Sequence, residues 1–408
     1  MNGLNTERSA FQRIYRGACL LGAALTIAAT AMPGAIAQTS PASESSPAAD
    51  GRVMLEAMSP GWNLGNTLEA ISDGAGPFAT SQETAWGNPA VTQALFDAVA
   101  EAGFKSIRIP LAWNQYADAQ GNISPQWMAR VRQVVGYARN AGLYVMINVH
   151  WDGGWLQPVY QGREAVDAKL AHFWTQIATA FADADDHVLF AGTNEIMVTD
   201  VYSQPTQENC EVQNGFNQIF VDAVRATGGA NANRWLIVQG YNTNIDWTLG
   251  CNATLPDDSA ESRLMMEVHY YDPYHFTLDA ESDKWQWGAI ATDRSATVAG
   301  FDEAYADAQF LKIQRQFVDR GVPVILGEYA AILRNDRDRE QKFRNYWDLY
   351  VTYSAVRHGL IPVYWDNGYT RDHSSGLFNR SRGRLAYPAT AAVIVEGTKE
   401  GLKKPIGD

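Results

Sequence analysis

The 408-residue chain contains only three cysteines, and none of its apolar runs is followed by the glycine-rich loop that binds phosphates. No two closely spaced histidines share a helix face with an acid, which argues against a metal-dependent hydrolase, and we expect no metal or cofactor. Basic residues are scarce, with 32 Lys and Arg against 45 Asp and Glu, a net charge of −13. This acidic balance argues against nucleic acid or anionic membranes as partners and favours a neutral substrate.

The first 37 residues have the layout of a secretory signal peptide. Three arginines precede a small and apolar run at residues 17–31, and Ala-Ile-Ala at residues 35–37 offers a small-x-small cleavage site. The alternative, a membrane anchor, is weaker because the apolar run is too short to span a bilayer comfortably. We therefore expect cleavage near Ala37, secretion to the periplasm or the extracellular space, and no membrane association afterwards.

Cleavage at that point would change both the charge and the cysteine count. It removes three arginines and one glutamate, leaving 29 basic (32 − 3) and 44 acidic (45 − 1) residues, or −15. It also removes Cys19, so that Cys210 and Cys251 remain in an oxidising compartment. We expect a disulfide between them, and the alternative is two free buried cysteines.

The remaining chain reads as a single domain. Residues 38–52 are rich in Ser, Pro and Ala and predict a flexible linker. No second linker follows, so residues 53–405 are expected to form one catalytic domain, long enough to bury a sizeable core. The 13 tryptophans suggest a large core, stacking platforms for sugar rings, or both.

Strand and helix patterns alternate along this domain. Apolar runs predict strands at residues 61–66, 105–110, 143–150, 188–192, 235–239, 264–269, 322–327 and 360–365. Helical patterns lie at residues 91–103, 125–141, 163–183, 213–226, 303–320, 339–357 and 387–396. Eight buried strands with intervening helices predict an α/β fold, a (β/α)8 TIM barrel. A doubly wound open sheet is the alternative, disfavoured by the missing phosphate loop.

Two glutamates follow two of the predicted strands. Glu195 comes after the run at residues 188–192 and Glu328 after the run at residues 322–327, 133 positions apart (328 − 195). The carboxyl ends of barrel strands open onto one face, so the two acids can face each other across one cleft. Glycosidic bond hydrolysis needs two opposed carboxyl groups. Either acid alone would read as a helix cap or a solvated loop residue.

Further polar and aromatic residues occupy the same ends of other strands, where packing alone would have scattered them between both ends. They are Arg108, His150, Asn194, His269, Tyr271 and Trp365. Arg108 could instead pair with a core acid. Trp113, Trp155 and Trp247 are either sugar subsites or packing residues, and Asp366 and Asn367 either bind sugar or cap the last loop.

Seven short stretches give the chain its resemblance to a known family. They are Gly-Trp-Asn-Leu-Gly-Asn-Thr at residues 61–67, Arg-Ile-Pro at 108–110, Asn-Val-His at 148–150, Asn-Glu at 194–195, His-Tyr-Tyr at 269–271, Gly-Glu-Tyr at 327–329 and Tyr-Trp-Asp-Asn-Gly at 364–368. In this order they resemble glycoside hydrolase family 5, most of all its endo-β-1,4-glucanase branch. Two positions depart from the family pattern: Ile196 replaces a proline, and Trp151 replaces a second histidine.

The resemblance implies roles for the strand-end residues. Glu195 would be the general acid and then the base, and Glu328 the nucleophile, in a retaining mechanism with carboxyl groups roughly 5 Å apart. Arg108 and Tyr271 would keep the nucleophile ionised, and Asn194 would bind the sugar 2-hydroxyl. The remaining residues implied to bind or orient the substrate are His150, His269, Trp365, Asn66 and Trp151.

The expected function is that of a secreted, monomeric, retaining endo-β-1,4-glucanase. The expected substrate is a cellulose-like chain, a mixed-linkage β-glucan or xyloglucan, and the sequence leaves the choice among these three open. One alternative is the same chemistry on β-mannan or another hemicellulose. Another is a non-catalytic barrel that only binds polysaccharide, which should have lost one of the two glutamates, although both are present.

Overall fold

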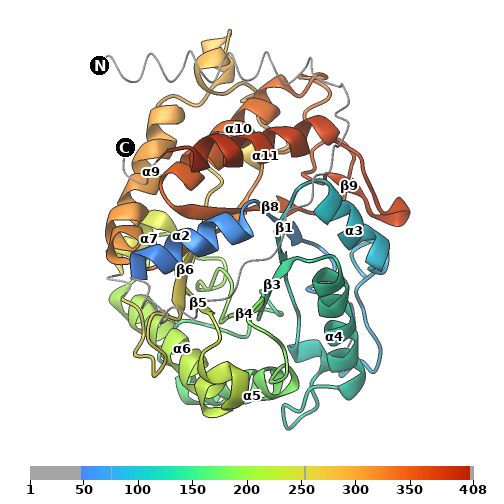
Figure 1. The fold of residues 1–408 in the computed structure, drawn as a ribbon, viewed down its shortest axis with the longest axis vertical. Coiled ribbons are helices and arrows are strands. Elements are labelled where there is room, and N and C mark those ends of the chain that lie inside the picture. Colours follow the sequence, from blue (N-terminus) through green and yellow to red (C-terminus); the bar gives the residue numbers. More distant parts are fainter. Residues whose placement is uncertain (1–46, 75, 252–253, 405–408) are drawn as a thin grey trace, which may run out of the picture.

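Eight parallel strands close into a barrel in chain order, with β8 returning beside β1 (Figure 1). The computed structural model describes residues 47–74, 76–251 and 254–404. The strands are β1 (Gly61–Leu64), β2 (Ser106–Ile109), β3 (Tyr144–Asn148), β4 (Val188–Ala191), β5 (Leu236–Asn244), β6 (Leu264–His269), β7 (Val324–Tyr329) and β8 (Leu360–Asp366). The predicted (β/α)8 TIM barrel is therefore confirmed, and the doubly wound alternative is wrong.

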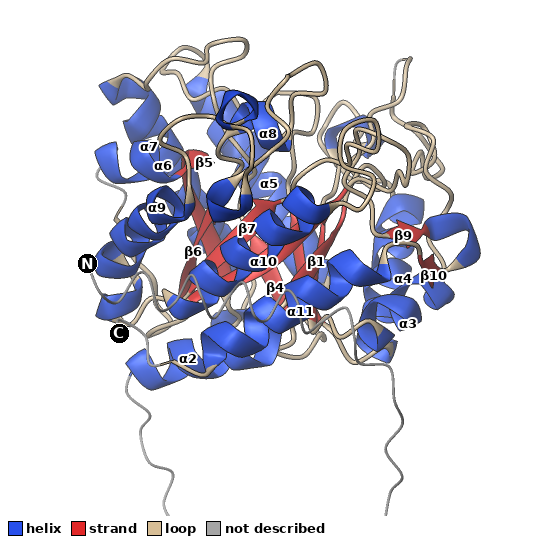
Figure 2. Ribbon diagram, turned by 90° about the horizontal axis from the view of Figure 1, so that it is seen from above, coloured by secondary structure: helices blue, strands red, loops and turns tan. Residues whose placement is uncertain are grey.

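Helices surround the strands, and long loops gather at one end of the barrel (Figure 2). The helices are α2 (Pro47–Met58), α3 (Gln93–Glu101), α4 (Pro125–Asn140), α5 (Arg163–Ala180), α6 (Gln207–Ala226), α7 (Ile245–Gly250), α8 (Tyr274–Thr277), α9 (Glu303–Gln316), α10 (Lys342–Arg357) and α11 (Pro388–Leu402). A two-stranded sheet, β9 (Phe378–Asn379) with β10 (Arg384–Leu385), lies beside α3. None of the helices in the described ranges is long and apolar enough to cross a bilayer.

The N-terminal boundary of the domain differs from the prediction. Helix α2 begins at Pro47, so residues 47–52 of the predicted linker belong to a helix, with the proline at its first turn where no N–H partner is needed. Arg52 holds this helix in place by donating to the carbonyl of Leu402 at the end of α11 (2.9 Å). The predicted signal peptide and residues 38–46 lie outside the described residues.

Two element boundaries in the middle of the chain also differ. Helix α6 starts at Gln207, six residues before the predicted start at residue 213, because Thr206 and Asn209 form a capping box. Strand β5 continues past the predicted end at Gln239 to Asn244, through an irregular register. Helix α4 begins where the sequence predicted it, at Pro125, and Ser124 caps it, since the Ser124 hydroxyl accepts from the Trp127 N–H (3.4 Å).

The barrel interior changes from apolar to polar along its axis. Near the start of the strands, Met54, Leu55 and Met58 of α2 pack with inward-facing strand residues such as Met146 and Met265 and close that end. The outward faces of the strands pack against the helices in a larger apolar core, which takes up most of the tryptophans. Because one end is filled by apolar side chains, a site for a polar ligand is confined to the other end, where the loops lie.

The structure contains the predicted disulfide between Cys210 and Cys251, with Cα atoms 5.1 Å apart. Cys210 lies in the first turns of α6, and Cys251 directly follows α7. The bond therefore links the end of α7, which follows β5, to α6, which precedes β5.

Candidate active site

The two predicted glutamates lie at the loop end of the barrel, close to each other. Glu328 is the fifth residue of β7 and is buried, whereas Glu195 follows β4 and has a side chain that is 40% exposed. One carboxylate oxygen of each glutamate and one ring nitrogen of His269 all lie within 4.8 Å of one another. The structure thus brings two carboxyl groups and an imidazole together at the loop end of the barrel.

Glu328 is held by two donors from other strands. Arg108 Nη1, from β2, lies 2.9 Å from Oε1, and the Tyr271 hydroxyl donates to Oε2 at 3.0 Å. Burial and the charge of Glu195 raise the pKa of Glu328 above its usual value, although the positive charges of His269 and Arg108 and the Tyr271 hydrogen bond oppose this rise. Fixed between these groups, the carboxylate presents itself to the cleft in one orientation.

Glu195 adopts a backbone conformation that a non-glycine residue rarely takes, with φ of 47°. This turn directs its side chain towards His269, whose Nδ1 lies 2.7 Å from Glu195 Oε1. His269 Nδ1 is also 3.8 Å from Glu328 Oε2, so the imidazole stands between the two acids. Strained backbone of this kind is common at functional sites. We infer that the position required of the Glu195 side chain determines the local conformation, at a cost in backbone energy.

Arg108 fulfils both of the roles considered for it. Besides Glu328, its guanidinium forms an ion pair with the buried Glu267, Nε to Oε1 at 2.9 Å. It also donates to Oδ1 of Asn63 (2.9 Å) and to Oδ1 of Asn194. Burial lowers the pKa of Arg108, but the charges of Glu267 and Glu328 outweigh this effect and raise it. Arg108 is therefore charged and orients both Asn194 and Glu328.

A buried polar layer under the two acids was not predicted from the sequence; it consists of Glu267, Gln239 and Asn63. Glu267 contacts His269 as well as Arg108, and Gln239 Nε2 donates to it at 2.7 Å. A signal was available in the sequence: an acid inside an otherwise apolar strand, two residues before His269, must share the inward face with that histidine.

Trp365 and His150 form one wall of the site. Their rings are nearly parallel, 5° apart, with centroids 5.9 Å from each other. Asn148 lies 3.1 Å from His150 Nδ1, and burial together with the charges of Arg108 and His269 lowers the His150 pKa well below its usual value. His150 is thus neutral and available as a hydrogen-bonding partner, while Trp365 remains partly exposed for stacking.

Two cavities meet at Glu195. One, of about 410 Å³, is lined by His150, Trp151, Asn194 and the exposed Tyr202, among others. The other, of about 270 Å³, lies on the His269 and Tyr271 side and includes Tyr274. Trp151 is 55% exposed and faces the larger cavity, so this departure from the family pattern adds an aromatic surface to the cleft.

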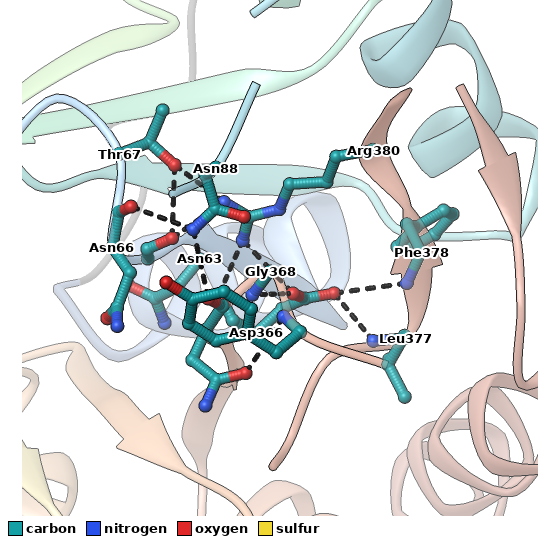
Figure 3. A network of polar contacts seen from close by, with 12 residues as sticks. Asn63, Asn66, Thr67, Asn88, Asp366, Gly368, Leu377, Phe378 and Arg380 are labelled. Carbon is teal, nitrogen blue, oxygen red and sulfur yellow. Dashed lines mark hydrogen bonds and ion pairs between the residues drawn. The ribbon is translucent and has the colours of Figure 1, made fainter. Parts of the chain in front are cut away.

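Two further candidates, Asp366 and Asn66, take part in a polar network around the loop after β8. Asp366 caps the loop after β8: it accepts from the N–H groups of Leu377 (2.7 Å) and Gly368 (2.7 Å) and pairs with Arg380 (Figure 3). Asn66 belongs to the same network through its backbone, accepting from Asn88 Nδ2 at 2.8 Å (Figure 3).

The three tryptophan candidates differ in how deeply they are buried. Trp113 is fully buried, and its indole donates to the Asn148 carbonyl (2.8 Å), so the subsite interpretation is wrong for this residue. Trp155 donates to Asp152 (2.7 Å) and is half-buried, as is Trp247.

The grouping of Glu195, His269 and Glu328 is also compact enough to hold a metal ion. The charges nearby oppose this. Burial lowers the pKa of His269, but the charge of Glu328 and the hydrogen bonds with Glu195 and Glu267 outweigh it and raise the pKa to about 9. A protonated imidazole has no lone pair for a metal, and the Arg108 cation already contacts Glu328. The donor set therefore does not fit a cation.

Comparison with known proteins gives the same answer as the geometry. The family model described as cellulase (glycosyl hydrolase family 5) matches residues 71–371. The chain is 43% identical over 351 residues to the xyloglucan-specific endo-beta-1,4-glucanase of Bacteroides ovatus, covering 83% of this chain and 68% of that protein. It is 38% identical over 360 residues to endoglucanase A of Paenibacillus barcinonensis, covering 83% and 88%.

A solved structure agrees with these relatives. The family 5 xyloglucanase of Paenibacillus pabuli superposes with a TM-score of 0.80 at 39% identity, covering 85% of this chain and 99% of that one. With the family model matching most of the domain and both glutamates facing each other at the end of the barrel, this chain belongs to glycosyl hydrolase family 5 and is a glycoside hydrolase.

Proposed function

We propose that this endo-β-1,4-glucanase works by double displacement, with Glu328 as the nucleophile and Glu195 as the general acid and then the base. The observation that carries the proposal is the short distance between the two acids: one carboxylate oxygen of Glu195 lies within 4.8 Å of one carboxylate oxygen of Glu328. Retaining glycosidases hold the two carboxyl groups about 5 Å apart, whereas inverting enzymes need roughly 6.5–9.5 Å to admit a water molecule. A spacing this short favours direct attack by Glu328 on the sugar.

The reaction then runs in two balanced steps. In the first step the Glu328 carboxylate forms a bond to the anomeric carbon, the glycosidic C–O bond breaks, and Glu195 gives its proton to the leaving oxygen. In the second step water attacks the anomeric carbon, Glu195 takes a proton from the water, and the bond to Glu328 breaks. The product keeps the β configuration.

The neighbouring groups assist these steps in distinct ways. Arg108 and Tyr271 hold the nucleophile in one orientation and stabilise its charge when it is released. Asn194, which Arg108 orients, is placed to bind the 2-hydroxyl of the attacked sugar. Trp365 offers the stacking face for that sugar ring, and the neutral His150 beside it contributes a hydrogen bond.

Among the β-glucans we propose xyloglucan as the preferred substrate. Two of the relatives described above are xyloglucan-acting enzymes. The cleft also has the room that a branched chain needs, since the cavities on either side of Glu195 measure about 410 and 270 Å³. Trp151 and Tyr202 give the larger of them exposed aromatic surface suited to sugar rings.

We further propose that the enzyme is secreted and acts as a monomer. The layout of residues 1–37 and the disulfide between Cys210 and Cys251 both support passage into an oxidising compartment. All the side chains of the site come from one chain, so a second copy is not needed to complete it.

Release of reducing sugar by the purified protein from xyloglucan, mixed-linkage β-glucan, carboxymethylcellulose and glucomannan tests the proposal, with Glu328→Gln as the blank. We expect the fastest turnover on xyloglucan and none in the blank, although the variant still binds the polymer. Proton NMR of the first product should show the β anomer. Activity on glucomannan alone would support the mannanase alternative, and inactivation by chelator would support a metal-dependent mechanism.

A further inference from the structure

Glu267 is a buried acid to which the proposed mechanism gives no task. It lies in β6 two residues before His269, so both side chains point into the barrel. Its Oε1 is 3.2 Å from His269 Nε2 and 2.9 Å from Arg108 Nε, and its Oε2 accepts from Gln239 Nε2 at 2.7 Å. The Glu267 carboxylate thus contacts both positively charged groups of the site, His269 and Arg108, on the side away from the cleft.

The second nitrogen of His269 faces the reacting acids. Nδ1 lies 2.7 Å from Glu195 Oε1 and 3.8 Å from Glu328 Oε2. An imidazole with a carboxylate on each nitrogen satisfies both only when both nitrogens carry a proton. A continuous chain of hydrogen bonds thus runs from Glu267 through the His269 imidazolium to Glu195.

The neighbouring strand leaves space for this arrangement. Gly327 directly precedes Glu328, and a β-carbon at that position would overlap the carboxylate of Glu267. The glycine of the Gly-Glu pair therefore has a physical reason in this chain: it makes room for the acid behind His269.

We propose that Glu267 is a positioning residue for hydrolysis, which holds His269 so that Nδ1–H donates to Glu195 Oε1 and the acidic proton of Glu195 stays on Oε2, facing the leaving oxygen. This inference rests on the proposed function of Glu195.

The charges facing His269 fit this arrangement. They come from four strands or the loops that follow them: Arg108, Glu195, Glu267 and Glu328, with His150 close by and neutral. When Glu195 carries its proton, the two ionised acids balance Arg108 and the imidazolium, and the buried cluster has no net charge. Although burial lowers it, the pKa of His269 rises to about 9 because Glu328, Glu195 and Glu267 favour the charged form.

Removing the charge of Glu267 changes what His269 can do. With a neutral amide at position 267, the histidine loses one of the groups that stabilise its charge and releases a proton more easily. A neutral Nδ1 can then accept the proton of Glu195, which turns that proton away from the leaving oxygen. The loss should therefore concern proton donation and not binding.

The test is Glu267→Gln in the full-length protein, with Glu303→Gln as the matched control. Glu303 is also a buried acid, and it accepts from the Tyr346 hydroxyl (2.9 Å) away from the site. For Glu267→Gln we expect kcat on xyloglucan to fall about 10- to 100-fold with little change in KM, part of the 10²–10⁴-fold that general acids supply. Aryl glycosides with good leaving groups should lose less than about 3-fold at the bond-cleaving step, because they need no proton.

Histidine side-chain NMR gives a second readout that does not depend on activity. In the wild-type protein the His269 signal, assigned with His269→Asn, should remain that of an imidazolium up to pH of about 9. In Glu267→Gln the same signal should titrate about one pH unit lower or more, and in Glu303→Gln it should not move. A neutral His269 at pH 7 in the wild type, or equal losses on both substrate classes, would overturn the inference. Wild-type inactivity on every glucan would contradict the proposed function, while the titration would still decide the role of Glu267.

Discussion

The backbone of Gly327 lies against the carboxylate of Glu267, so closely that the glycine cannot gain a side chain without moving the acid. The two residues belong to adjacent strands, β6 and β7, and each lies one or two positions before a residue of the site, His269 or Glu328. A single methyl group at Gly327 would thus disturb the surroundings of both His269 and Glu328.

Gly327→Ala should therefore lower both activity and stability. Overpacking a buried position costs about 1–3 kcal/mol of unfolding free energy, and the displaced Glu267 should reduce kcat at the same time. The matched control is Gly136→Ala in α4, where an added β-carbon meets no atom within 4 Å. That variant should keep full activity and gain up to about 1 kcal/mol from the better helix former. Thermal unfolding and xyloglucan turnover of both variants measure the difference, and equal behaviour would contradict the packing argument.

Glu195→Ala should separate substrates by their leaving groups. Loss of a general acid should slow polysaccharide hydrolysis about 10²- to 10⁴-fold. An aryl glycoside with a good leaving group should still form the covalent intermediate quickly and then accumulate it, because the base for the second step is missing. A rapid burst of phenol followed by slow turnover is the expected stopped-flow trace. Glu101→Ala, at an exposed position at the end of α3, serves as the control and should behave as the wild type.

The sequence allowed the barrel and the pair of acids to be predicted for a physical reason. Parallel strands covered on both faces are continuous apolar runs, and any polar residue that ends such a run lies at the loop end of the barrel. Glu195, Glu328 and His269 all satisfied this rule, and the structure brings them together. The rule requires only position along the chain, so it does not depend on side-chain packing.

What could not be predicted depends on contacts between strands. Trp113 follows β2 and Asp366 is the last residue of β8, yet Trp113 packs inside and Asp366 anchors a loop. Position after a strand cannot tell these from ligand-binding residues, since the difference is which partner lies opposite. Glu267 was missed for the converse reason: it lies inside a strand, and its partners Arg108 and Gln239 come from two other strands.

The disulfide should contribute measurably to stability. It joins residues separated by 41 positions, and closing a loop of that length in the unfolded chain corresponds to about 4 kcal/mol in the chain-entropy model. Replacing Cys210 and Cys251 by serine should therefore lower Tm clearly. Added reductant should lower Tm of the wild type to a similar value and leave the double variant unchanged. A wild-type Tm that does not respond to reductant, with the thiols shown to be reduced, would contradict the prediction.

Asp348 should make the protein less stable as the pH rises from about 4 to 7. Burial raises its pKa from 3.8 to about 7, against the opposing charge of Arg344. Between these values the folded protein holds a proton that the unfolded chain has released, so unfolding becomes easier with increasing pH, by at most roughly 4 kcal/mol for about three pKa units. The Asp348→Asn variant has no titrating group at this position, so it should lack this contribution to the pH dependence.

Urea denaturation of both proteins at pH 4, 6 and 8 measures this effect. The variant should be more stable than the wild type at pH 8, with a flatter dependence on pH. Some slope should remain, because burial also raises the pKa of Glu69 to about 7 and that of Asp152 to about 6. Parallel curves for the two proteins would exclude Asp348 as a source.

Trp151 offers the last test, because it occupies a position where many family members have histidine. Its side chain is 55% exposed and lines the larger cavity beside Glu195, so it adds apolar contact area without supporting the core. Trp151→His should keep the folding stability within about 0.5 kcal/mol, as expected for a surface position. Losing an aromatic contact of about 1–2 kcal/mol should raise KM for xyloglucan roughly 5- to 30-fold. Tyr160→His, at another exposed aromatic that lines neither cavity, should change neither quantity. Because Trp151 touches no reacting group, kcat should stay close to the wild-type value, and a fall in kcat without a change in KM would mean that the residue acts on the acid and not on the sugar chain.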